Sequence, residues 1–159
     1  MPFTLLQAIA ELPDEALRRG LDHLQAAEFV YETGLFPDLE YSFKHALTHE
    51  VTYGGLLQER RRELHARIVE AIETLHRDRL VEHTERLAHH ALRGELREKA
   101  LDYLRQAGLK AAARWALPNA RGWFEQALGV LEGLPASPSE VCPARPRASA
   151  SSAIKMSTR

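Results

Sequence analysis

The sequence has a single cysteine, Cys142, among its 159 residues. One thiol cannot form an intramolecular disulfide or a multi-cysteine zinc cluster, and it fits a reducing compartment. No apolar run approaches the roughly 18 to 20 residues that are needed to cross a bilayer. Residues 1–4 also lack the basic region and the apolar stretch of a signal peptide. We therefore expect a cytoplasmic chain with no membrane partner.

An excess of charge of either sign is missing as well. The 21 Lys and Arg residues nearly balance the 22 Asp and Glu residues, which leaves a formal net charge of -1. This balance argues against nucleic acid or another strongly anionic partner. The length and the 45% hydrophobic content support one modest core. The chain is too short for two full-sized domains.

Common catalytic and nucleotide-binding motifs are absent. The sequence has no phosphate loop and no Gly-x-Gly-x-x-Gly, and Gly54-Gly55 is not followed by Lys-Ser or Lys-Thr. It has no Gly-x-Ser-x-Gly elbow either. We therefore expect that the chain is not an enzyme, that it needs no cofactor, and that it has no catalytic, cofactor-binding or metal-ligating residues.

The first part of the chain predicts two short helices and a β-hairpin. The first helix stops at Pro13 and the second begins near Asp14, because proline breaks a helix and carboxylates favour its first turn. Alternation then predicts a small hairpin near residues 28–43. One alternating set is apolar and consists of Phe29, Tyr31, Leu39, Tyr41 and Phe43. Within the two predicted strands, the residues that alternate with this set are polar except for Val30. Residues 1–55 are thus predicted to form a winged-helix-like arm.

Helical periodicity dominates residues 56–134, so the fold class is mainly α. A short helix over 45–53 precedes longer ones over about 56–76, 79–92, 96–115 and 118–131. The third of these five is expected to end at Gly94 in a left-handed cap. Trp115, Leu128 and Leu131 are expected in buried stripes. Short connections predict antiparallel helical hairpins.

A repeat pattern is present in the last two helices. In a window of about 34 residues that starts at Leu101, six residues match the tetratricopeptide pattern; they are Leu104, Gly108, Ala111, Ala120, Phe124 and Ala127. Such repeats are stabilised by stacking on neighbours, so we expect a tetratricopeptide-like region. Residues 135–159 are rich in Pro, Ser and Ala and are predicted to be a disordered tail.

Histidines provide the only pattern that suggests a metal. His45 and His49 are one helical turn apart and Glu50 follows, which raises the hypothesis of a metal-dependent hydrolase. A metalloprotease helix needs glutamate directly after the first histidine, where Ala46 stands. We therefore predict no metal site. A second group, His83, His89 and His90, is predicted to lie on a solvated helix face, although a pH-sensitive surface is an alternative.

Arginines and aromatic residues raise two further alternatives. Arg60-Arg61-Arg62 and Arg67 could contact DNA phosphates with the hairpin as a wing. Glutamates interleave with these arginines, which is typical of an exposed, salt-paired helix, so nucleic acid is not our favoured partner. Trp115, Trp123 and Phe124 are expected to fill a seam between helices rather than to line a peptide groove.

The segment Tyr41–His65 resembles a known family. It contains Tyr-x-Phe-Lys-His-Ala-Leu, Glu-Val-x-Tyr-x-x-Leu-Leu and Arg-Arg-x-x-His in order. This pattern is similar to the stretch after the ATPase core in bacterial signal-transduction ATPases with numerous domains, particularly those joined to class III adenylate or guanylate cyclases. Residues 87–90 and 98–108 resemble the start of their tetratricopeptide array. Departures occur at His49 and over 114–120.

The resemblance implies a fragment of a larger signalling protein. Its ATPase and cyclase residues would lie outside this segment, so no catalytic position is carried over. The implied function is a non-catalytic helical relay and protein-interaction module, whose partner is another protein or the missing upstream ATPase domain. The alternative is a DNA-binding transcriptional regulator that uses residues 3–43 as a winged helix.

Overall fold

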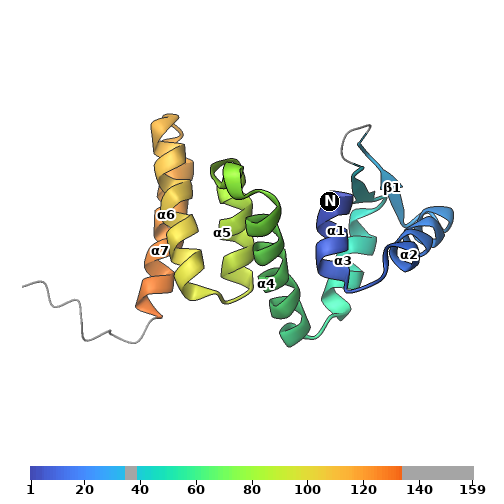
Figure 1. Ribbon diagram of the computed structural model, residues 1–159. Helices are drawn as coiled ribbons and strands as arrows, with labels where there is room; N and C mark the ends of the chain where they lie inside the picture. Colours follow the sequence, from blue (N-terminus) through green and yellow to red (C-terminus); the bar gives the residue numbers. More distant parts are fainter. Residues whose placement is uncertain (35–38, 134–159) are drawn as a thin grey trace, which may run out of the picture.

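The computed structural model describes residues 1–34 and 39–133, which are mainly helical, as predicted (Figure 1). The helices are α1 (Phe3–Ala10), α2 (Asp14–Ala26), α3 (Ala46–Gly55), α4 (Gln58–Leu75), α5 (Thr84–Arg93), α6 (Arg97–Ala113) and α7 (Leu117–Glu132). A 3-10 segment, η1 (Arg77–His83), lies before α5, and the strands are β1 (Val30–Glu32) and β2 (Tyr41–Phe43). The tail predicted over 135–159 lies outside the described residues.

Helices α4 to α7 stand side by side, and α1 to α3 with the hairpin lie at the other end of the molecule (Figure 1). Successive helices of this row run antiparallel, which confirms the predicted helical hairpins. Leu5 of α1 packs with Ile68 and Ile72 of α4 in one buried cluster. The arm is therefore joined to the row through α1. Within residues 1–34 and 39–133, no helix is both long and apolar enough to cross a membrane.

The N-terminal arm is held by a small core between its helices and its hairpin. Phe3, Leu17 and Leu21 are buried there together with Val30 and Tyr41. Asp14 and Glu15 occupy the first turn of α2, where their charges favour the helix dipole. These features agree with the predicted arrangement of two short helices and a hairpin.

The hairpin buries one residue from each of the two alternating sets, Val30 in the first strand and Tyr41 in the second. Its strands are antiparallel, with Val30 opposite Phe43 and Glu32 opposite Tyr41. Val30 and Tyr41 are buried, whereas Phe29 and Tyr31 are 46% and 47% exposed. The Phe29 amide donates to the Leu24 carbonyl at the end of α2, over 2.9 Å. The first strand thus differs from the prediction, and we attribute the difference to this contact, since it fixes the strand so that the next residue, Val30, faces the core.

The core of the helical row consists of branched side chains and alanines. Val69, Ile72, Leu87 and Leu104 are the large apolar residues that are almost completely buried. Gly108 lies directly against Phe124, because a Cβ atom at position 108 would be 2.6 Å from the Phe124 ring. This contact joins α6 to α7 through two of the residues that match the repeat pattern.

Several side chains that were expected to be buried are exposed at the end of the row. Trp115 is 86% exposed and Leu128 and Leu131 are 58% and 45% exposed. Ala120 and Ala127 are the buried residues of α7. The expected stripe was therefore too wide, since a helix with one packed neighbour buries only one face.

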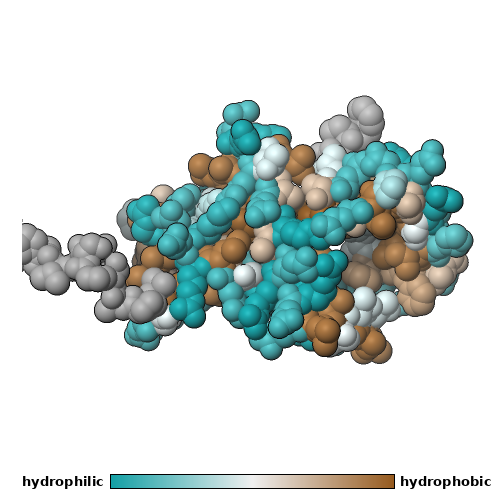
Figure 2. Space-filling model, turned by 60° about the horizontal axis from the view of Figure 1, so that its bottom comes forward, coloured by the Kyte–Doolittle hydropathy of each residue, from teal (hydrophilic) through white to brown (hydrophobic). Residues whose placement is uncertain are grey.

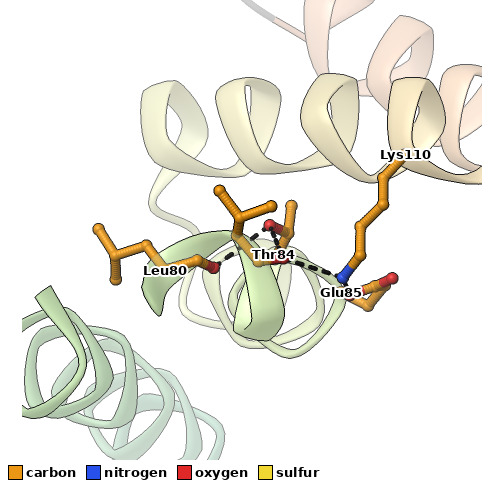
Figure 3. Close-up of polar contacts among 5 residues, drawn as sticks. Leu80, Thr84, Glu85 and Lys110 are labelled. Carbon is orange, nitrogen blue, oxygen red and sulfur yellow. Dashed lines mark hydrogen bonds and ion pairs between the residues drawn. The ribbon is translucent and has the colours of Figure 1, made fainter. Parts of the chain in front are cut away.

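The helix predicted over 79–92 is divided at its start. Arg79 has non-helical backbone angles within η1, and α5 begins only at Thr84. The Thr84 hydroxyl donates to the carbonyls of Leu80 and Val81 (Figure 3). Lys110 of α6 donates to the Val81 carbonyl over 2.9 Å and to Glu85 over 2.8 Å. These contacts attach the start of α5 to α6.

Gly94 does not form the predicted left-handed cap. Its φ is -80°, and the left-handed residue is its neighbour Glu95, with a φ of 55°. A Cβ atom at position 94 would lie 3.0 Å from the backbone nitrogen of Ala66 in α4. Glycine is therefore required for close approach of two backbones rather than for its conformational freedom.

Alanine at position 94 is expected to destabilise the fold, whereas glycine at position 95 is not. Gly94→Ala forces α4 away from the end of α5, so we expect it to lower the free energy of unfolding by about 1–3 kcal/mol. Glu95→Gly relieves a left-handed backbone and loses an exposed ion pair with Arg62, so a net change within about 1 kcal/mol is expected. Urea denaturation of both variants checks this, and a tolerated Gly94→Ala would contradict it.

Candidate functional site

Tyr53, near the end of α3, lies where three helices meet. Its hydroxyl oxygen is 3.0 Å from Nε2 of His65 in α4, and Arg93 of α5 donates to the same oxygen over 3.3 Å. His65 is itself buried. Since α3 has no buried residue of its own, these polar contacts are important for its position.

Two histidines continue this set of contacts. Nδ1 of His65 lies 2.8 Å from Nδ1 of His90 in α5. At this distance one nitrogen must donate and the other accept, so at least one ring is neutral. Arg93 donates to Tyr53. The other two contacts run in the same direction, either from Tyr53 through His65 to His90 or from His90 through His65 to Tyr53, according to the tautomers of the two rings. We call Tyr53, His65, His90 and Arg93 the polar relay.

The environment keeps the relay histidines uncharged near neutral pH. Burial lowers the pKa of His90 to about 4. A proton on His65 or His89 and the positive charges of Arg86 and Arg93 act in the same direction. Burial and the charge of Arg93 also lower the pKa of His65 and of His89. Each shift arises because the charged imidazolium is poorly solvated and faces other cations.

An open pocket with a cavity volume of about 490 Å³ lies beside the relay. We call it the tyrosine–arginine pocket, and it is lined by Tyr53, Gln58, Arg61, Arg62, Arg93 and Glu95. The Arg61 guanidinium lies over the Tyr53 ring, 4.9 Å from its centroid. It also donates to the carbonyls of Gly54 and Leu56 over 2.8 and 2.9 Å. Arg61 therefore caps α3 and forms one wall of the pocket.

The structure separates the residues of the metal hypothesis. His45 precedes α3 and is exposed, as is Glu50. His49 lies edge-on to Phe43 and stacked on Tyr53, with ring centroids 5.3 and 6.0 Å apart. Across residues 1–34 and 39–133, no group of three or more His, Cys, Asp or Glu side chains is arranged to hold a metal.

The other predicted histidine group is divided between two places. His83 lies against His76, with ring centroids 4.2 Å apart. His89 is exposed, as predicted, whereas His90 is half-buried in the relay. The pairing of His65 with His90 was not predicted from the sequence. The sequence did contain one signal. His65 lies three residues before the buried Ile68, and this spacing places both residues on the same face of the helix.

The basic segment of α4 makes mostly intramolecular contacts. Arg60 pairs with Glu63 over 2.6 Å, and Arg67 pairs with Glu11 of the arm over 2.8 Å. Arg62 pairs with Glu95 over 3.2 Å. This agrees with the predicted salt-paired helix. Trp123 and Phe124 are half-buried near α6, as expected for a seam between helices, unlike Trp115.

Comparison with known proteins identifies one relative of greater length. The chain is 32% identical over 127 residues to an uncharacterized protein of Rhizobium meliloti (strain 1021). The match includes 78% of this chain, and it spans 12% of the relative's length. No family model matches the chain. No solved structure matches it either. The observed similarity is therefore to a segment of a longer protein.

Proposed function

We propose that the chain is a non-catalytic helical relay and protein-interaction module of a bacterial, cytoplasmic signalling protein that is linked to an ATPase or a cyclase. The observation that supports this most is the presence of exposed apolar side chains on α3 in the arm and on α7, the last helix of the row. A module that transmits contacts between flanking protein surfaces requires two exposed apolar faces.

The first face is on α3. Leu47 and Val51 are one helical turn apart and are 69% and 67% exposed. Leu57, just after this helix, is 78% exposed. A helix that buries none of its own residues while presenting apolar side chains at this spacing fits a surface that packs against another protein segment.

The second face is on α7. Leu117, Leu128 and Leu131 are between 45% and 59% exposed. Their spacing of eleven and three residues places them on one side of the helix, next to the side that carries the buried Ala120 and Ala127. Full burial of each leucine would contribute about 1.5–3 kcal/mol. Stacked helical repeats use such a face to pack on the next unit.

The surface in Figure 2 is consistent with this proposal. It shows hydrophobic areas between hydrophilic ones on the face that is drawn, including an area close to the grey atoms at the end of the row. The motifs of the signalling ATPase family and the longer relative provide further support, because both place similar segments within larger proteins.

The DNA-binding alternative has less support. Three of the four arginines in its proposed contact surface pair with carboxylates, and the net charge of the chain is -1. DNA binding by a small domain usually depends on a basic face.

A photo-cross-linking experiment tests the proposal. Benzoylphenylalanine in place of Leu117, on the same side of α7 as Leu128 and Leu131, is expected to cross-link a protein that carries a nucleotide-binding ATPase or cyclase domain. The purified chain is then expected to change the nucleotide turnover of that protein. The double variant Leu128→Asp and Leu131→Asp should weaken the association of the chain with this protein at least about tenfold, because apolar anchors dominate interfaces.

Leu24→Asp is the matched control, because Leu24 is also an exposed leucine of a helix, 42% exposed on α2. It should leave the association unchanged. ATP binding by the isolated chain, or a cross-linked partner without a nucleotide-binding domain, would contradict the proposed function.

A further inference from the structure

The tyrosine–arginine pocket contains positive charge that the described residues do not neutralise. Arg61 donates to two backbone carbonyls and Arg93 donates to the Tyr53 hydroxyl, all of which are neutral acceptors. Within residues 1–34 and 39–133, neither guanidinium forms an ion pair with a carboxylate. Both lie near the same aromatic ring, with centroid distances of 4.9 and 6.0 Å.

The third arginine of the pocket has a partner. Arg62 pairs with Glu95, so the lining residues carry three guanidinium groups against one carboxylate. The neighbouring histidines also experience this charge. Burial is the main cause of the lowered pKa of His65 and His89, and Arg93 is the next cause for each. The pocket is therefore a local cationic site on a chain whose total charge is slightly negative.

We propose that this pocket binds a carboxylate side chain of an acidic segment in the partner protein. The inference rests on the proposed interaction role. A carboxylate can accept paired hydrogen bonds from guanidinium groups, and these bonds are stronger than neutral ones. The side-chain amide of Gln58 is a further donor in the lining. Leu57, immediately before it, is 78% exposed and offers an apolar contact, so the preferred segment has a leucine-like residue beside its acidic residue.

The distribution of charge favours a peptide over a nucleic acid. Glu95 is part of the pocket, and Glu59 and Glu63 lie on the same helix as Arg61 and Arg62. A phosphate backbone would place further negative charges beyond the pocket, near these glutamates, where they would be repelled. A single carboxylate places its charge between Arg61 and Arg93 only.

An NMR titration of the full chain tests the inference. The probe is the peptide acetyl-Leu-Glu-Glu-Leu-amide, with acetyl-Leu-Gln-Gln-Leu-amide as its neutral counterpart. We expect the acidic peptide to shift the side-chain Nε–H resonances of Arg61 and Arg93 in a saturable manner. Because charge-assisted bonds carry the recognition, the neutral peptide should bind at least about tenfold more weakly than the acidic peptide.

Variants then identify the pocket as the binding site. Arg93→Gln should weaken binding of the acidic peptide about tenfold, whereas Arg105→Gln, at an exposed arginine of α6, should not change it. Circular dichroism confirms that both variants are folded. Equal binding of the two peptides, no saturable shift, or tighter binding of a short DNA duplex than of the acidic peptide would overturn the inference. Because the proposed function is tested on α7, its result can stand when this inference fails.

Discussion

Replacing Leu104 with alanine is expected to lower the free energy of unfolding by about 3 kcal/mol. Leu104 is fully buried and packs with Ala88 of α5 and Ala127 of α7. Truncation would leave a cavity at the contact of three helices, and the small alanines around it have little side chain with which to fill the space. Equilibrium urea denaturation, followed by circular dichroism, measures the loss.

The same substitution elsewhere on α6 provides the control. Leu109 lies on the same helix and is 53% exposed, so Leu109→Ala is expected to change stability by less than about 0.5 kcal/mol. A similar loss in both variants would show that α6 does not bury the face that carries Leu104.

Acidification is expected to destabilise the fold through His90. Its folded-state pKa is about 4, below the ordinary histidine value of 6.5, so the unfolded chain binds a proton more readily. The associated stability is complete above about pH 6.5 and is lost as the pH falls toward 4. Allowing for partial solvent screening, we expect His90 to account for a loss of roughly 2 kcal/mol.

The groups around His90 all act in the same direction. His65 of α4 and the neighbours His89, Arg86 and Arg93 on α5 each disfavour a second positive charge. Tyr53 of α3 contributes a neutral hydroxyl to the relay through His65. Protonation of both rings would also remove the His65–His90 hydrogen bond.

Variants separate His90 from the other groups that titrate in acid. His90→Gln should reduce the loss of stability between pH 7 and pH 4, while His23→Asn, at an exposed histidine of α2, should retain it. Thermal denaturation of both variants across this range measures the difference. An unchanged pH dependence in His90→Gln would show that the relay does not control acid stability.

Helix positions were largely predictable because hydrophobic periodicity is a local property. The spacing of Leu104, Gly108, Phe124 and Ala127 identified the two helices that pack as α6 and α7. The hairpin was also predicted, but the buried residue of its first strand was not. Phe29 and Tyr31 have the expected alternation, yet the contact at the end of α2 gives the buried position to Val30. The boundaries of the predicted domains remain a prediction.

The candidate site was much less predictable, because its residues come from three helices. Tyr53, His65 and His90 are separated by 12 and 25 residues, and nothing in their local sequence indicates that they meet. The sequence instead suggested a pairing of His45 with His49, which are close along the chain. Similarly, it assigned the left-handed cap to Gly94, although the close approach of Ala66 is what requires glycine there.

The sequence by itself determined that this chain is mainly helical, that a small hairpin lies in its first part, and where most helices begin and end. These properties depend on residues within one or two helical turns of each other. The tertiary structure decided which faces are buried, which apolar faces remain open on α3 and α7, and which polar side chains meet at Tyr53. Those outcomes depend on how helices distant in sequence pack together, and helical periodicity alone does not specify that packing.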